Sequence, residues 1–198
     1  KNVFGNPAIW VLAIANFFVY IVRYAVLDWG PTLLGEWKGV SIHHAGWMVA
    51  AFEISGIVGM LVAGWATDRF FGGRGPRVCV ICMALATVFV ALFWGISQPP
   101  MWLATLLLGA AGFCIYGPQA LVGIAAANIA TKKAAATAVG FTGLFGYAST
   151  LVSGWGLGLL AQHYGWNIAV GALILIAIMG TLIFMAAWSA KANGYDND

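Results

Sequence analysis

The stretch Ile9–Leu27 reads IWVLAIANFFVYIVRYAVL, a run of nineteen residues that is almost wholly apolar apart from Arg23. A run of this length can cross the hydrocarbon core of a bilayer as a helix. A cation near its middle costs about 2.5–3.5 kcal/mol to insert, so an intramembrane arginine usually faces a partner charge or an anionic ligand. The segment therefore predicts an integral membrane protein that handles anions, with Arg23 at its functional site.

The composition of all 198 residues agrees with this, because 62% are hydrophobic and only 8% are charged. A soluble globular domain carries about 25% charged residues. Cys79 and Cys82 are spaced as C-x-x-C, but they lie in an apolar run with no second pair and no nearby histidine. We interpret them as packing residues rather than metal or redox ligands. We expect no metal, no cofactor and no nucleic-acid partner, and membrane lipid as the surroundings.

Six segments are each long enough to cross the membrane as a helix, and turn residues separate them. We predict spans at about 8–34, 44–67, 77–97, 101–129, 134–161 and 166–191. Basic residues gather on one side of these spans: Lys1, Arg69, Arg74, Arg77, Lys132, Lys133 and Lys191. Lys38 alone falls on the other side. The positive-inside rule then puts both termini in the cytoplasm. The abrupt start at Lys1 suggests a fragment or the second half of a longer chain.

Three charged residues lie well within the predicted spans: Arg23, Asp28 and Glu53. The rise of a helix places Arg23 and Glu53 at a similar depth, about 15–18 Å from the outer end, with Asp28 shallower. One interpretation is a structural pair in which Glu53 neutralises Arg23. The other is that the carboxylates hold the site in only one conformation and an anionic substrate competes for Arg23, which suits alternating access.

Tyr20 lies one helical turn before Arg23, so both side chains project from the same face. A phenolic hydroxyl beside the planar fork of a guanidinium suits phosphate recognition. Tyr24, the neighbour of Arg23, is expected to face elsewhere. Asn16, one turn further along the Tyr20 face, either lines the same cavity or bonds to a neighbouring helix, and we favour the second.

In the fourth span, Gly117–Pro118 predicts a kink or discontinuity that would place Tyr116 beside a central cavity. Small residues also recur at helical spacing in the second and fifth spans: Ser55, Gly59 and Ala63, and Gly140, Gly143 and Gly146. Such stripes indicate helix packing more often than ligand binding. Tyr147 ends the glycine run of the fifth span, and its side chain is the one there that could bind a ligand.

The loop Gly64–Arg77, GWATDRFFGGRGPR, resembles the G-x-x-x-D-[RK]-x-x-G-[RK]-[RK] motif of the major facilitator superfamily. It lies between the second and third predicted spans, where that motif belongs. The resemblance implies that Asp68 and Arg69 form a gate, with Asp68 pairing with a loop arginine or a helix N-terminus to close the cytoplasmic side. The alternative is plain positive-inside anchoring. An extra glycine and Pro76 interrupt the basic cluster, which leaves the partner of Asp68 open.

Four stretches resemble, in order, the organophosphate:phosphate antiporters of this superfamily, and among them the second half of the bacterial glycerol-3-phosphate transporters. They are Ala15–Leu34, Phe52–Gly75, Ile115–Pro118 and Lys132–Tyr147. The resemblance implies an all-α membrane protein, a six-transmembrane-helix bundle that forms the C-terminal half of a twelve-helix fold. Such a half is built as a 3+3 inverted repeat. Its partner would be the N-terminal six-helix half of the same transporter.

The resemblance also implies roles for single residues. Arg23 matches the arginine that binds the phosphoryl group together with a second arginine from the N-terminal half. The cavity-lining tyrosines of the family match Tyr20, Tyr116 and Tyr147. The acidic residues of its inter-helix ion pairs match Asp28 and Glu53. Val139 and Thr142 stand where the hexose-phosphate branch carries an aspartate and a lysine, which favours glycerol-3-phosphate or a related small ester.

For the full protein, the resemblance implies exchange of an organophosphate for inorganic phosphate across the bacterial inner membrane by rocker-switch alternating access. No catalytic constellation lies in the spans, so we do not expect an enzyme. One alternative is a non-transporting sugar-phosphate sensor of the same family. The other is a proton-coupled organic-anion transporter, in which Asp28 or Glu53 would carry the proton.

Overall fold

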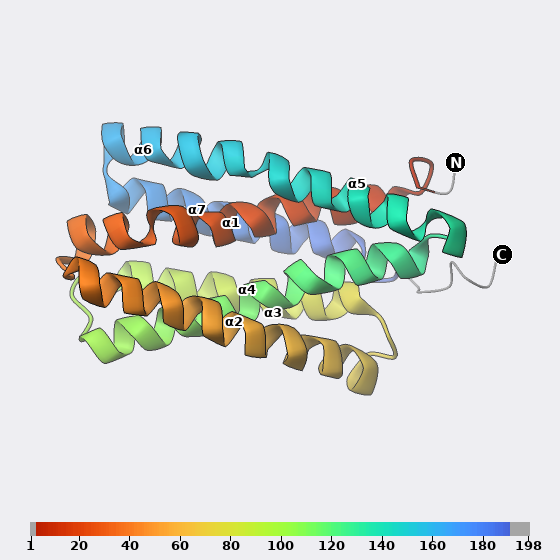
Figure 1. Ribbon diagram of the computed structural model, residues 1–198, viewed down its shortest axis with the longest axis horizontal. Coiled ribbons are helices and arrows are strands. Elements are labelled where there is room, and N and C mark those ends of the chain that lie inside the picture. The colour runs from red at the N-terminus through yellow and green to blue at the C-terminus, as the bar shows by residue number, and fades with distance from the viewer. Residues whose placement is uncertain (1–2, 191–198) are drawn as a thin grey trace.

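A computed structural model describes residues 3–190, and this part of the chain folds as a bundle of helices without strands (Figure 1). Five of its six spans are single helices: α1 (Pro7–Lys38), α2 (Ile42–Phe70), α3 (Gly75–Gly95), α4 (Met101–Ile129) and α7 (Trp166–Ala186). The fifth span, Lys132–Tyr164, joins four pieces: η1 (Lys132–Ala134), α5 (Ala135–Ala148), η2 (Val152–Gly156) and α6 (Leu157–Tyr164). All six are long and apolar enough to cross a bilayer, as expected of a multi-pass membrane protein.

The helix ends follow local sequence signals. α1 begins where the Asn6 side chain accepts a hydrogen bond from the Ala8 amide, with Pro7 in the first turn, and it ends at Gly39, whose φ of 69° suits glycine. α4 coincides with the predicted span 101–129, and α1 and α2 extend past their predicted spans by up to four residues. α7 ends at Ala186, before the predicted end of the last span at 191, because residues 187–190 are not helical. Lys1 and Lys191 lie outside the described residues.

Small residues line the extensive contact between α2 and α4. A Cβ atom at Gly59 would overlap the main chain of Phe113, and one at Gly112 would overlap that of Phe52. Ser55 Oγ donates a hydrogen bond of 2.7 Å to the Gly109 carbonyl across the same contact. The interpretation of the second-span stripe as packing is therefore confirmed, since the two backbones approach only where side chains are small or absent.

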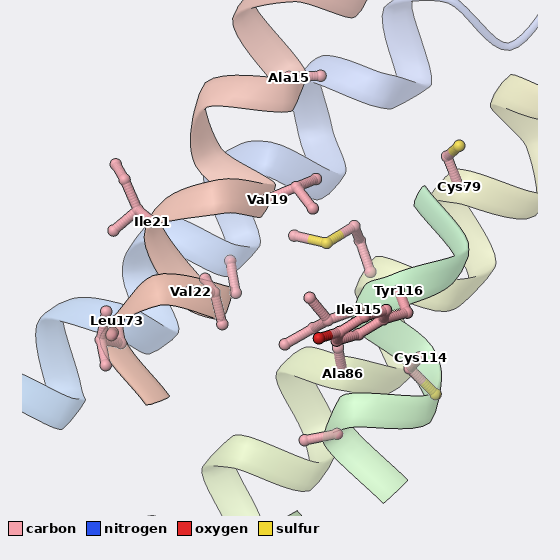
Figure 2. Packing of buried hydrophobic residues seen from close by; sticks show 14 of the residues in the cluster. Ala15, Val19, Ile21, Val22, Cys79, Ala86, Cys114, Ile115, Tyr116 and Leu173 are labelled. Atoms are coloured by element: carbon pink, nitrogen blue, oxygen red, sulfur yellow. The ribbon is translucent and has the colours of Figure 1, made fainter. Parts of the chain in front are cut away.

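The apolar core lies mainly between α1, α3, α4 and α7. Val19 and Val22 of α1 and Ile115 of α4 point into the space between their helices (Figure 2). Cys79 and Cys114 are buried in the same core, and Cys82, the second cysteine of the C-x-x-C pair, is partly buried against it. Their burial among apolar side chains confirms the prediction that the C-x-x-C spacing reflects packing, and burial keeps thiols of this kind unreactive.

Of the kink or discontinuity predicted in the fourth span, the discontinuity is absent, because α4 continues through Gly117–Pro118 as one helix. Gly117 faces the second and third spans there, with room for only a hydrogen: a Cβ would come within 2.9 Å of that of Ala63. The break occurs instead in the fifth span, at the π-helical turn η2. The Trp29 indole N–H lies 3.1 Å from both the Ser153 and Gly154 carbonyl oxygens of this turn.

One end of the bundle, which we call the basic end, carries five cations: Arg69, Arg74, Arg77, Lys132 and Lys133. Because successive spans alternate in direction, the α2–α3 and α4–α5 turns meet where α1 begins and α7 ends (Figure 1). Arg77 Nε accordingly donates a hydrogen bond to the Trp188 carbonyl at 3.3 Å. Lys38 lies at the opposite end, where Nζ donates to the Ile96 carbonyl at 2.6 Å. The described lysine and arginine residues outside the bundle centre are thus divided between the two ends as the sequence predicted.

Candidate functional site

Three side chains from three helices meet between the two ends of the bundle. Arg23 of α1 donates a hydrogen bond of 2.8 Å from Nη2 to the Tyr116 hydroxyl of α4. That hydroxyl in turn donates a hydrogen bond to Glu53 Oε2 of α2. Arg23 Nη2 and Glu53 Oε2 are 3.6 Å apart, so the two charges form an ion pair with the phenol inserted beside it. The predicted match in depth between Arg23 and Glu53 is confirmed.

Aromatic rings hold the guanidinium in place. Its carbon lies 4.6 Å from the centroid of the Tyr116 ring and 5.4 Å from that of Tyr24, within the range of cation–π attraction. The expectation that Tyr24 faces elsewhere is therefore wrong. The spacing of four residues between Tyr20 and Tyr24 puts both on one helical face, and their rings lie 5.7 Å apart, so this signal was available in the sequence.

A second layer of polar side chains lies one turn closer to the basic end. The Tyr20 ring of α1 meets the Tyr147 ring of α5 edge to face, with centroids 5.9 Å apart. Tyr147 is 63% exposed, so one side of this layer is open. Gln119 of α4 lies beside Tyr20. It follows Tyr116 by three residues, which puts both on the same helical face, so the signal for this residue is present in the sequence.

Asn16 lies a further turn toward the basic end and takes part in helix packing. Its side-chain amide donates a hydrogen bond of 2.9 Å to the Thr142 carbonyl of α5, and the residue is 3% exposed. This confirms the preferred prediction that Asn16 bonds to a neighbouring helix. Gly146 permits that approach, because a Cβ there would lie 2.9 Å from Asn16 Nδ2, whereas Gly140 and Gly143 have no such neighbour among the described residues within 4 Å.

The ion-pair layer contains buried polar atoms that the described residues leave unpaired, Arg23 Nε and Glu53 Oε1. Both side chains are only partly exposed, 16% for Arg23 and 32% for Glu53. A charged network with open donors and acceptors is costly in a low-dielectric setting unless a further partner completes it. Chemically, the free edge of the guanidinium can donate hydrogen bonds to an anionic oxygen.

The other predicted gating residues lie apart from this centre. Asp28 is exposed, and neither it nor Asp68 or Arg69 forms an ion pair with another residue in the range 3–190. Asp68 lines a small cavity of about 100 Å³ between the ends of α2 and α4, which Asn128 and Gly73 also line. The assignment of these three residues to ion pairs or gating stays a prediction.

The sequence model of the Major Facilitator Superfamily matches residues 6–194. The chain belongs to the Major Facilitator Superfamily. This is a family of membrane transporters rather than enzymes. The fold agrees, since the superfamily resemblance predicted an all-helical bundle of six spans and residues 3–190 form one.

Curated relatives within the superfamily carry three kinds of name. The chain is 40% identical over 189 residues to "Probable hexose phosphate transport protein" of Chlamydia pneumoniae, covering 95% of this chain and 42% of that protein. It is 37% identical over 190 residues to "Glycerol-3-phosphate transporter" of Bacillus subtilis, covering 96% and 43%. It is 36% identical over 179 residues to "Membrane sensor protein UhpC" of Escherichia coli, covering 90% and 40%. The chain thus spans less than half the length of these relatives.

Proposed function

We propose that this chain is the C-terminal six-helix half of a bacterial inner-membrane transporter that exchanges an organophosphate ester for inorganic phosphate. The observation that carries the proposal is Arg23, partly buried between the ends of the bundle with an unpaired Nε and an ion pair of 3.6 Å to Glu53. The relatives named for hexose phosphate and glycerol-3-phosphate transport support the substrate class. A matching N-terminal half, with its own arginine, would close the site.

In the proposed mechanism a phosphoryl group displaces Glu53 from Arg23. A phosphate ester presents about two negative charges and three oxygens, whereas a carboxylate presents one charge and two oxygens, so phosphate suits the guanidinium fork better. Release of Glu53 loosens the connection that Arg23, Tyr116 and Glu53 make between α1, α2 and α4. Substrate binding thereby shifts the balance between two arrangements of the halves, as rocker-switch alternating access requires.

The basic end is proposed to face the cytoplasm, in keeping with its five cations. Asp68 and Arg69, at that end of α2, are proposed to gate the cytoplasmic side once the N-terminal half supplies a partner. Asp28, exposed on α1 toward the opposite end, is proposed to form its ion pair with the same half. The bundle itself is proposed to consist of two inverted three-helix repeats, α1–α3 and the spans that follow.

For the substrate we propose glycerol-3-phosphate or a related small ester. The argument rests on Val139 and Thr142, uncharged residues of α5 at positions where the hexose-phosphate branch carries an aspartate and a lysine. Identity alone does not separate the candidates, because the hexose phosphate and glycerol-3-phosphate relatives are 40% and 37% identical to this chain.

A sensor is the second candidate, favoured by the 36% identity to a membrane sensor protein. Proteoliposomes loaded with inorganic phosphate and containing the full-length transporter separate the two. We expect uptake of glycerol-3-phosphate that requires internal phosphate and is lost in Arg23→Lys, because lysine keeps the charge but not the planar fork. Lys38→Arg, which keeps the charge at the opposite end of the bundle, outside the site and the proposed gate, is the matched control. Tight binding without exchange favours the sensor, and unchanged uptake in Arg23→Lys contradicts the site.

A further inference from the structure

Gln119 brings an unpaired acceptor into the layer next to Arg23. Its Oε1 atom is buried, and none of the residues in the range 3–190 gives it a hydrogen-bond partner. The side chain lies beside Tyr20 of α1 and three residues from Tyr116 on the same face of α4. An amide oxygen in this position needs a donor, because a buried acceptor without one loses the hydrogen bonds that water supplied.

The position of Gln119 relative to Arg23 sets the kind of donor that fits. Tyr20 and Gln119 lie about one helical turn, ~5 Å, from the Arg23–Tyr116 layer toward the basic end. An ester that binds Arg23 with its phosphoryl group and extends its organic part toward the basic end would lie against Gln119 and Tyr20. Hydroxyl groups on that organic part could donate to the free Oε1 atom, whereas an alkyl chain could not.

We propose that Gln119 recognises a hydroxyl group on the organic part of the substrate and so selects polyhydroxylated phosphate esters over simple alkyl phosphates. Arg23 binds the phosphoryl group that all such ligands share, and Gln119 accepts a hydrogen bond from the organic group attached to that phosphoryl group. Tyr20 assists by packing beside the amide and by offering a second hydroxyl to the same ligand. The inference rests on the proposed function, because it takes the phosphoryl position from Arg23.

The test is calorimetric binding to the full-length protein in detergent, with four ligands: inorganic phosphate, propyl phosphate, glycerol-3-phosphate and glucose-6-phosphate. Gln119→Met keeps the length of the side chain and removes its acceptor, and Gln119→Leu is a second variant in case the first folds poorly. Gln162→Met, at an exposed position of α6, is the matched control. We expect Gln119→Met to weaken at least one hydroxylated ester about threefold to tenfold, the value of one hydrogen bond. Inorganic phosphate and propyl phosphate should change by less than about twofold.

Each other outcome overturns the inference. Equal weakening of all four ligands would make Gln119 a support of the phosphoryl site or of the fold. Unchanged affinity for both hydroxylated esters in Gln119→Met would exclude recognition. Wild-type protein that binds phosphate but does not prefer hydroxylated esters to propyl phosphate overturns this inference alone. Wild-type protein that binds none of the four overturns the proposed function with it.

Discussion

Gly56 of α2 lies so close to the ring of Tyr116 on α4 that a methyl group at position 56 would overlap the ring. The Tyr116 phenol that links Arg23 and Glu53 therefore packs directly against the backbone of α2 at Gly56. The small residue serves the site as well as the helix contact, because it fixes where the Tyr116 hydroxyl can lie.

Replacing Gly56 by alanine should therefore disturb both stability and binding. The added methyl group cannot fit without moving the ring or separating α2 from α4, a change that costs about 1–3 kcal/mol in a packed core. We expect a lower melting temperature, measured by the reaction of the buried thiols of Cys79 and Cys114 with a fluorescent maleimide on unfolding. Gly64→Ala on the same helix has open space and should melt as the wild type or slightly higher. Equal melting of the two variants would contradict the contact.

Removing only the Tyr116 hydroxyl should weaken phosphate binding. In Tyr116→Phe the bridge between Arg23 Nη2 and Glu53 Oε2 is lost, and the two charges, already 3.6 Å apart, can close to a direct hydrogen bond. Phosphate then competes with a tighter ion pair, so we expect its dissociation constant to rise about threefold to tenfold. Calorimetry on the full-length protein measures this. The Tyr24 ring lies against Arg23, but its hydroxyl forms no hydrogen bond with the residues that the structure describes. The Tyr24→Phe variant should therefore bind phosphate like the wild type.

Neutralising the carboxylate separates the two interpretations of the Arg23–Glu53 pair. If Glu53 competes with substrate, Glu53→Gln should tighten phosphate binding about threefold to tenfold, because a neutral amide holds the guanidinium less well than a carboxylate does. Exchange should slow, since the pair no longer favours the substrate-free arrangement. A large fall in melting temperature without tighter binding would instead identify a purely structural pair.

The fold and the relative depth of the charged residues in the candidate site were predictable from local rules. The rise of a helix fixed the relative depth of Arg23 and Glu53, and helical periodicity put Tyr20 on the face of Arg23. Charge asymmetry between the loops divided the two ends of the bundle correctly for the residues that the structure describes. These properties depend on position along one helix or on the count of charges, so they need no knowledge of how the helices pack.

Contacts that depend on how one helix is rotated against another were not predictable. The insertion of the Tyr116 hydroxyl between two charges depends on the rotation of α4 against α2, which Gly56 and Gly59 allow. The unbroken course of α4 through Pro118 depends on its neighbours, and so does the π-helical turn of the fifth span. The sequence was enough to place Asp28 within a membrane span. It could not identify an ion-pair partner for Asp28, and none of the residues in the range 3–190 forms an ion pair with it.

The π-helical turn η2 should depend on the Trp29 side chain that contacts it. A π turn misaligns the regular helical hydrogen bonds, and the Trp29 N–H satisfies the Ser153 and Gly154 carbonyls at 3.1 Å. Trp29→Phe removes this donor but keeps the aromatic ring, so we expect a loss of about 1–2 kcal/mol in stability. Hydrogen exchange should rise at residues 149–157, as the turn opens more often. Trp155→Phe, at a position 76% exposed, should change neither quantity. Unaltered exchange in Trp29→Phe would show that the turn persists without the indole.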